Sequence, residues 1–413
     1  MLRELDRNLD EAGFDRAMEA QREKGRASAG FSANLGQKIT VSSPVEFLGY
    51  ENTQANMEVL ALFDLDGEPV ESLSEGRGVV VADKTVFYAE SGGQLGDQGL
   101  LSYSDFVFRV EDTQKSGVQT LHIGSVVKGM VEIGVVLEGE IDVDRRRRLS
   151  GSHSATHLMH SALRELLGSH VQQKGSLVAE ERLRFDFSHE GSLNRDELIE
   201  IEKVVGEQVR MNTAVDVTLM PYEQAISSGA LAFFGEKYAE EVRVVRMGGD
   251  FSAELCGGTH VAQTGEIGEF KIISETGVAS GVRRIEALTG AQAINESQIE
   301  QGKLLKISEY LKTDPSRIEE RVEQLVEENK RLVKEMSGIS LRLAADSIGE
   351  LEKGITKVGE VSYLGGKIEG DSDLALKLLD SLKSKYNEKY VFLIVHQSDQ
   401  SAGLVTVVSK DLV

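Results

Sequence analysis

Two pairs of potential metal ligands, far apart in the chain, share a four-residue spacing. His153 and His157 lie in SHSATHLMHSALRELL, whose apolar residues recur at helical spacing, so both imidazoles should leave one helix face a turn apart. Cys256 and His260 repeat the spacing in LCGGTHV, where the two intervening glycines favour a turn over a helix. Two or three imidazoles and one thiolate suit a tetrahedral ion of borderline softness, and Zn²⁺ is the default.

The sequence leaves the ligand set of this predicted site open. His160 is a rival ligand, because it follows His157 by three residues and lies on nearly the same helix face as His153. With three protein ligands, zinc keeps a position at which it can activate water and polarise an ester carbonyl. With four ligands the site is closed, and the metal would orient the substrate, or one ligand would yield to water during turnover. The competing interpretation is a buried structural cysteine and satisfied core histidines.

Several stretches around these residues resemble one protein family. They are HSATH and the LxxALxxxLGxHVxQKGSLV pattern after it, RLRFDFSH, CGGTHV, FYAESGGQLGDQG at 87–99 and GVASGVRRIEALTG at 277–290. Together they resemble the editing domain of alanyl-tRNA synthetases and their free-standing AlaX relatives, over about residues 12–290. The remainder looks like the linker and C-terminal domain of the full synthetase. The resemblance implies a fragment without the aminoacylation core, which should not activate alanine.

The resemblance also implies a reaction and residue roles. The reaction is zinc-dependent hydrolysis of the ester bond in alanine tRNA that has been mischarged with serine or glycine. Thr156 and Gln173 match family positions associated with recognition of the serine hydroxyl, whereas Gly92, Gly93 and Gln94 would lie near the tRNA acceptor end. The alternative is a zinc-stabilised tRNA-binding and dimerisation module without catalysis. A zinc peptidase is disfavoured, because HSATH lacks the glutamate of HExxH.

Composition limits the cellular setting and the mode of RNA binding. One cysteine in 413 residues excludes an intramolecular disulfide framework, and the sequence has neither a signal peptide nor a run long enough to span a membrane, so a cytoplasmic protein is expected. The net charge of -22 opposes binding of nucleic acid by bulk electrostatics, so tRNA contacts must be local. The RRRR cluster with Arg145 and Arg146, together with Lys174, is the predicted basic surface; the alternative for RRRR is a solvated helix start.

The predicted fold class is α+β, in five segments. The β-rich runs with turns at about ten-residue spacing indicate a small β-barrel or sandwich, and helices beside an antiparallel sheet should hold the metal pairs. Within the latter we expect a long helix over about 150–168 and a second helix from Arg195 to Met211, capped by Asn194 with Glu197. The segments are a helical linker (1–35), a β-barrel subdomain (36–142), the zinc-binding editing domain (143–295), a helical coiled-coil segment (296–346) and a small, truncated α/β C-terminal domain (347–413).

The coiled-coil segment carries its own prediction. Apolar residues alternate steps of four and three from Ile318 to Leu343, with Asp314 as N-cap and Pro315 at the first helical position. Asn329 on this seam would fix the register between two helices, which predicts a homodimer through the helical and C-terminal segments; the alternative is packing within one chain. The last segment alternates strands and a helix in β-α-β order.

Overall fold

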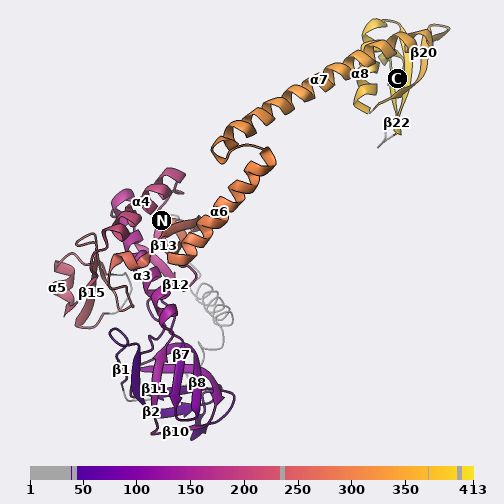
Figure 1. Ribbon diagram of the computed structural model, residues 1–413. Coiled ribbons are helices and arrows are strands. Elements are labelled where there is room, and N and C mark those ends of the chain that lie inside the picture. Colours follow the sequence, from indigo (N-terminus) through magenta and orange to yellow (C-terminus); the bar gives the residue numbers. More distant parts are fainter. Residues whose placement is uncertain (1–38, 40–43, 233–237, 371, 398–401) are drawn as a thin grey trace, which may run out of the picture. The chain divides into compact units, whose positions relative to one another are not determined.

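The structure is a computed structural model (Figure 1) that describes residues 39, 44–232, 238–370, 372–397 and 402–413. Internal contacts divide the chain into two units, Met1–Ile299 and Glu300–Val413, and each is considered by itself. The helical linker predicted for residues 1–35 lies outside the described residues. The fold is mixed, with helices and several separate sheets.

A closed six-stranded β-barrel forms the first part of the first unit, which confirms the predicted barrel over the sandwich. The strand order is β11-β7-β8-β9-β5-β2, and pairing of β11 with β2 closes the ring. Exposed and buried residues alternate along β11, so one face of the strand fills the interior. The strands are β2 (Gln54–Phe63), β5 (Arg77–Ala82), β7 (Gly99–Tyr103), β8 (Phe106–Ser116), β9 (Gln119–Lys128) and β11 (Val136–Ile141), bordered by β1 (Glu46–Phe47), β3 (Pro69–Val70), β4 (Ser72–Leu73), β6 (Lys84–Thr85) and β10 (Val131–Glu132).

The barrel contains a buried histidine that makes its stability depend on pH. His122 on β9 is fully buried, and its ring nitrogens lie 2.8 Å from Thr85 Oγ1 and 2.9 Å from Val80 O. Burial lowers the pKa of His122 from 6.5 to about 4, because the interior disfavours the charged ring. Between these values the unfolded chain binds the proton and the folded chain does not. The stabilisation is therefore complete above about pH 6.5 and declines as the pH falls towards 4.

As the pH falls from 6.5 towards 4, we expect His122 to lower the free energy of unfolding by up to ~1.4 kcal/mol per pH unit. Urea unfolding of the wild type at several pH values would measure the slope. His122→Gln keeps a polar group but does not titrate, so its stability profile should be flatter over the same range. Parallel profiles for the two proteins would contradict the assignment.

The first metal-ligand pair lies on helix α3 (Val143–Leu167), the longest helix among the described residues of the first unit. Asp142 caps this helix by accepting a hydrogen bond from the Arg145 backbone N–H. The helix therefore begins at Val143 and the predicted start near residue 150 is wrong, because the Asp142 cap allows the RRRR segment to form the first turns of the helix. One face packs into the core through side chains that are 0% exposed, namely Ala155, Leu158, Met159, Ala162 and Leu163.

An antiparallel sheet packs against α3 and completes this core. Its order is β12-β13-β18-β17, and Phe185 and Phe187 of β13 lie in one apolar cluster with Leu158 and Met159. This arrangement confirms the predicted helices beside an antiparallel sheet. The strands are β12 (Gln173–Val178), β13 (Leu183–Ser188), β17 (Phe270–Ala279) and β18 (Val282–Thr289).

Helix α4 (Arg195–Met211) confirms the second predicted helix at both ends. The Asn194 side chain accepts from the Glu197 backbone N–H, and the Glu197 carboxylate accepts from the Asn194 N–H, which is a complete capping box. A three-stranded sheet follows and carries the second metal-ligand pair near its end. It comprises β14 (Asp216–Pro221), β15 (Glu241–Met247) and β16 (Ser252–Leu255), with α5 (Tyr222–Ser227) and the short helix η2 (Thr264–Ile267) nearby in sequence.

The second unit contains a long helix and a small α/β sheet. The parallel strands β20 and β21 are joined through α8, so the predicted β-α-β order is confirmed. Along α7 (Ile318–Lys353), Val322, Leu332 and Met336 are 43%, 46% and 67% exposed, so a partner for the predicted seam stays a prediction.

No helix among the described residues has the length and apolar character needed to cross a bilayer. The elements are α6 (Gly290–Leu311), which begins in the first unit, η3 (Pro315–Arg317), α7 (Ile318–Lys353), β19 (Thr356–Val358), β20 (Val361–Glu369), α8 (Ser372–Lys385), β21 (Lys389–Gln397), β22 (Ala402–Val408) and η4 (Lys410–Leu412).

Candidate metal centre

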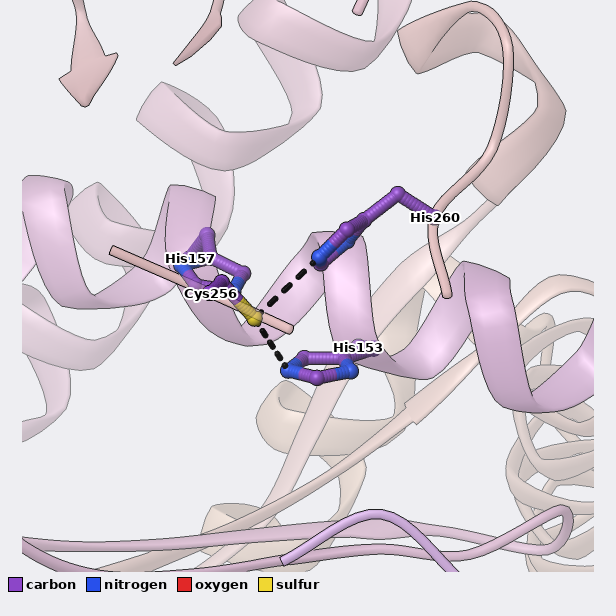
Figure 2. A group of neighbouring side chains, drawn as sticks. All are labelled: His153, His157, Cys256 and His260. Atoms are coloured by element: carbon purple, nitrogen blue, oxygen red, sulfur yellow. Dashed lines mark hydrogen bonds between the residues drawn. The ribbon is translucent and has the colours of Figure 1, made fainter. Parts of the chain in front are cut away.

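The two pairs of potential ligands come together in the fold. His153, His157, Cys256 and His260 each offer a ligand atom, and these atoms all lie within 4.8 Å of one another. Cys256 Sγ is 3.4 Å from His153 Nε2 and 3.3 Å from His260 Nε2, and Figure 2 shows both rings directed towards the sulfur. Helix α3 supplies the first pair, and the turn after β16 supplies the second. His160, the rival ligand, is not a member of this group.

Each imidazole of the cluster is held at Nδ1 by another side chain. His153 Nδ1 lies 2.8 Å from Gln94 Oε1, and His260 Nδ1 lies 3.2 Å from Ser154 Oγ. His157 Nδ1 contacts the carboxylate of Glu254. A histidine that donates from Nδ1 keeps the Nε2 lone pair free for a metal, so the acceptor oxygens of Gln94 and Glu254 favour the ligating tautomer at His153 and His157.

Glu254 is a functional candidate that sequence reasoning missed. It is 1% exposed, and its two carboxylate oxygens contact Nδ1 of His157 and, at 2.7 Å, Nδ1 of His160. Burial acts to raise the pKa of Glu254, but the two histidines lower it, so the carboxylate stays ionised. A buried acid needs such partners. In the sequence, the only sign of this role is that Glu254 lies on a strand two residues before Cys256.

The turn that carries Cys256 is fixed at three consecutive carbonyl oxygens. Arg243 Nη1 donates to Cys256 O at 2.9 Å and to Gly258 O at 2.8 Å, and the Tyr50 hydroxyl donates to Gly257 O at 2.6 Å. A Cβ on Gly258 would lie 2.1 Å from the His153 ring, so only glycine permits the approach. Sequence reasoning also missed Arg243 and Tyr50, because neither is near the motif in sequence.

The electrostatics of the cluster favour a metal-binding thiolate. Burial acts to raise the pKa of the Cys256 thiol, but His153, His157 and His260 hold it well below its usual range. For His157, burial acts to lower the pKa, but Glu254 and Cys256 outweigh it and raise the pKa to about 10, so a metal that binds this ring must displace a proton. Burial lowers the pKa of His260 to about 3, so this imidazole is neutral at physiological pH. Thiolate and neutral imidazole are the forms that bind zinc.

The donor set and its spacing fit a zinc ion. With Zn–S near ~2.3 Å and Zn–N near ~2.0–2.1 Å, neighbouring ligand atoms in a tetrahedron are roughly 3.5 Å apart. The two distances from Cys256 Sγ, 3.4 and 3.3 Å, agree with this value. In addition, His157 Nε2 is buried and makes no hydrogen bond of acceptable geometry with a described residue. These residues could therefore hold a metal ion.

A cavity of about 600 Å³ opens beside the cluster, within the range of roughly 300–1,000 Å³ that is typical of small-molecule sites. Three of the four candidate ligands line it, His260 being the exception. Thr156 and Gln173, the predicted substrate-recognition residues, also line it. The cavity therefore combines potential metal ligands with polar groups that could orient a substrate. Its wall further includes the aromatic rings of Phe47, Tyr50 and Tyr88.

The three predicted acceptor-end residues occupy different environments. Gly92 lines the cavity. Gly93 packs against β12, where a Cβ would lie 2.3 Å from Ser176 Oγ. Gln94 is fully buried, and besides holding His153 it donates from Nε2 to Thr259 Oγ1 at 2.9 Å. Its placement favours a positioning role at the cluster over direct tRNA contact.

The predicted basic surface is largely used inside the protein. Arg145 is 5% exposed and donates to Gly96 O at 2.6 Å, and Arg146 pairs with the buried carboxylate of Asp97. These contacts tie the start of α3 to the loop between β6 and β7, which favours a structural role over the predicted tRNA contact and over the solvated helix start. Lys174 is exposed and stays a candidate for phosphate contact.

Comparison with known proteins relates the chain to enzymes of protein synthesis. The family model for class II (A) tRNA synthetases matches residues 1–145, and that for the "Threonyl and Alanyl tRNA synthetase second additional domain" matches residues 242–286. An alanine–tRNA ligase of Hydrogenovibrio crunogenus is 45% identical over 412 residues, which are 99% of this chain and 47% of the relative. An alanine–tRNA ligase of Pseudomonas entomophila is 42% identical over 412 residues, which are again 99% of this chain and 47% of the relative. The chain thus spans about half the length of these relatives.

Proposed function

Because the chain belongs to the alanine–tRNA ligase family, we propose that it removes serine or glycine from mischarged alanine tRNA by hydrolysing the aminoacyl ester. The observation that carries this proposal is the convergence of His153, His157, Cys256 and His260 on the wall of a cavity. The match to the second additional domain covers Cys256 and His260, which supports an editing role for this part of the chain.

We further propose the segment boundaries given above as domains. Residues 36–142 would form the barrel subdomain, 143–295 the zinc-binding editing domain, 296–346 a coiled-coil segment and 347–413 the C-terminal α/β domain. The exposed apolar residues of α7 support a homodimer through the helical segment.

Zn²⁺ is the proposed cofactor, with His153, His157, Cys256 and His260 as its ligands. With all four residues bound the ion would have no open position, so it would orient the substrate, or would act as a Lewis acid on the ester carbonyl once one ligand yields its place. The protein's own contribution is to position the reactants. An aminoacyl ester is already activated, so holding the ester and a water molecule in a fixed geometry contributes much of the rate.

Discrimination between serine and alanine would reside in Thr156 and Gln173. Thr156 Oγ1 donates to Ser152 O at 2.8 Å, which leaves its lone pairs available to accept from a serine hydroxyl. Gln173 Nε2 lies 3.3 Å from Ser176 Oγ on the same cavity wall. A pocket that pairs with a hydroxyl leaves its own polar groups unsatisfied when alanine binds, and this penalty disfavours the correct product.

The proposal is tested by deacylation of Ser-tRNA and Ala-tRNA, both built on the alanine tRNA. We expect release of serine to be at least ~100-fold faster than release of alanine, because a site that hydrogen-bonds a hydroxyl strongly rejects the analogue without it. Release is measured from labelled amino acid under single-turnover conditions. Equal rates, or rates no higher than in buffer, would contradict a deacylase.

The competing function is a zinc-stabilised tRNA-binding module without catalysis. It predicts tight binding of alanine tRNA with no hydrolysis of either ester. The cavity beside the potential ligands favours the enzyme, since a purely structural zinc site needs no adjoining space.

A further inference from the structure

Three aromatic rings form a continuous wall on the cavity. The Phe47 ring meets Tyr50 edge to face at a centroid distance of 4.8 Å, and it meets Tyr88 in the same manner at 6.0 Å. All three line the cavity that also holds His153, His157 and Cys256. The aromatic wall, defined as Phe47, Tyr50 and Tyr88, comes from the barrel side of the chain, whereas the potential metal ligands come from α3 and the turn after β16.

The aromatic wall is held rigidly at its most exposed member. Tyr50 remains 47% exposed, although its hydroxyl donates to Gly257 O and the Arg243 guanidinium lies 4.3 Å from its ring centroid. The Tyr88 hydroxyl is fixed by Ser91 O at 3.1 Å. An exposed ring that is fixed in orientation loses little conformational entropy when a flat ligand stacks on it.

Charge near the wall suits an anionic, aromatic ligand. Lys115 lines the cavity and is exposed to solvent. Arg243 adds a second cation behind the Tyr50 ring. The anionic groups that line the same cavity, Glu254 and Cys256, contact histidines, whereas Lys115 and Arg243 are the cations beside the aromatic wall. Stacking rings combined with cations is the arrangement that binds single-stranded nucleic acid.

We propose that the aromatic wall is a nucleobase subsite, which stacks the terminal base of the aminoacylated RNA while the ester lies at the His/Cys cluster. This inference rests on the proposed function, because the ester is what brings the base into the cavity. A cavity of about 600 Å³ is large enough for a ligand of drug-like size such as an aminoacyl nucleoside. The wall would position the ester and would take no part in breaking it.

The experiment compares two small esters of serine, one on the 3′-hydroxyl of adenosine and one on the 3′-hydroxyl of methyl riboside, which has no base. The readout is the ratio of kcat/KM for the two esters. Phe47→Leu is the principal variant, because Phe47 makes no hydrogen bond to the turn after β16. Tyr103→Leu is the matched control, since Tyr103 is 54% exposed on β7 and does not line the cavity.

We expect the wild type to prefer the adenosine ester and Phe47→Leu to reduce that preference by about 5- to 150-fold, the range of one lost base–aromatic stack. Tyr103→Leu should keep the preference. A ratio that is unchanged in Phe47→Leu would overturn the subsite and assign the rings to packing alone.

A second measurement separates this proposal from the proposed function. Saturation-transfer NMR detects binding of free adenosine without any hydrolysis. Adenosine should give a signal with wild type and Tyr103→Leu, and little with Phe47→Leu, while methyl riboside gives none. If neither ester is hydrolysed but adenosine binds in this pattern, the deacylase fails and the subsite stands. If both esters are hydrolysed but adenosine does not bind, the subsite fails alone.

Discussion

Cys256→Ala should lose its bound metal and at least ~100-fold of its rate of Ser-tRNA deacylation. It should therefore also lose the preference for serine over alanine. Changes at residues that only support a metal ligand cost ~10- to 100-fold in affinity or activity, so removal of a ligand should cost no less. The thiol is also the only sulfur donor that this chain offers from cysteine. Metal content by mass spectrometry and single-turnover deacylation measure the two effects separately.

The matched control for Cys256→Ala is His189→Ala. His189 lies at the end of β13, where it contacts His170 rather than the cluster, so its loss removes an imidazole without touching the proposed site. This variant should keep both metal and activity. If Cys256→Ala retains a full equivalent of zinc and its wild-type rate, Cys256 is a core residue and the proposed centre is wrong.

Glu254→Gln should weaken zinc binding by ~10- to 100-fold, the usual cost of losing a partner that orients a metal-bound histidine. The amide keeps the shape of the carboxylate but loses its charge and one acceptor oxygen, so it cannot accept from both His157 and His160. The weaker hydrogen bonds leave His157 less firmly in the tautomer that points Nε2 towards the ion. Competition with a chelator of known affinity measures the change.

The control here is Glu241→Gln, which neutralises an exposed carboxylate at the start of β15. Thermal unfolding of the zinc-free proteins checks that Glu254→Gln is folded. The cobalt-substituted protein adds a spectroscopic measure, since a change in ligand geometry alters the visible spectrum. Wild-type affinity together with an unaltered cobalt spectrum would show that Glu254 does not support the centre.

Local signals in the sequence were sufficient for parts of this fold. Helix α4 matches its prediction at both ends, because Asn194 and Glu197 form a cap from neighbouring residues alone. The convergence of His153 with Cys256 was also predictable, since ligand types at matched spacing occur rarely by chance. The roles of the individual residues remain predictions until they are measured.

Other features depend on tertiary contacts, which sequence spacing does not encode. The sequence predicts Gln94 in an RNA-facing loop, yet its side chain contacts the His153 ring, because the loop between β6 and β7 folds onto α3. The sequence predicts Arg145 on a basic surface, yet it is buried and donates to Gly96 in this loop. Glu254 and Arg243 gave no motif at all, since an acid or an arginine on a strand becomes informative only when its partners are known.

The hydrogen bonds of Gln94 and Tyr50 limit how the chain can be dissected. Both residues precede α3, yet one steadies the His153 ring and the other steadies the backbone next to Cys256. A recombinant piece that started at α3 would keep all four potential ligands and lose two of their supports. The smallest autonomous piece that preserves the pocket should therefore retain the barrel together with the sheets that follow, and screening for inhibitors or substrates on anything shorter would sample a loosened site.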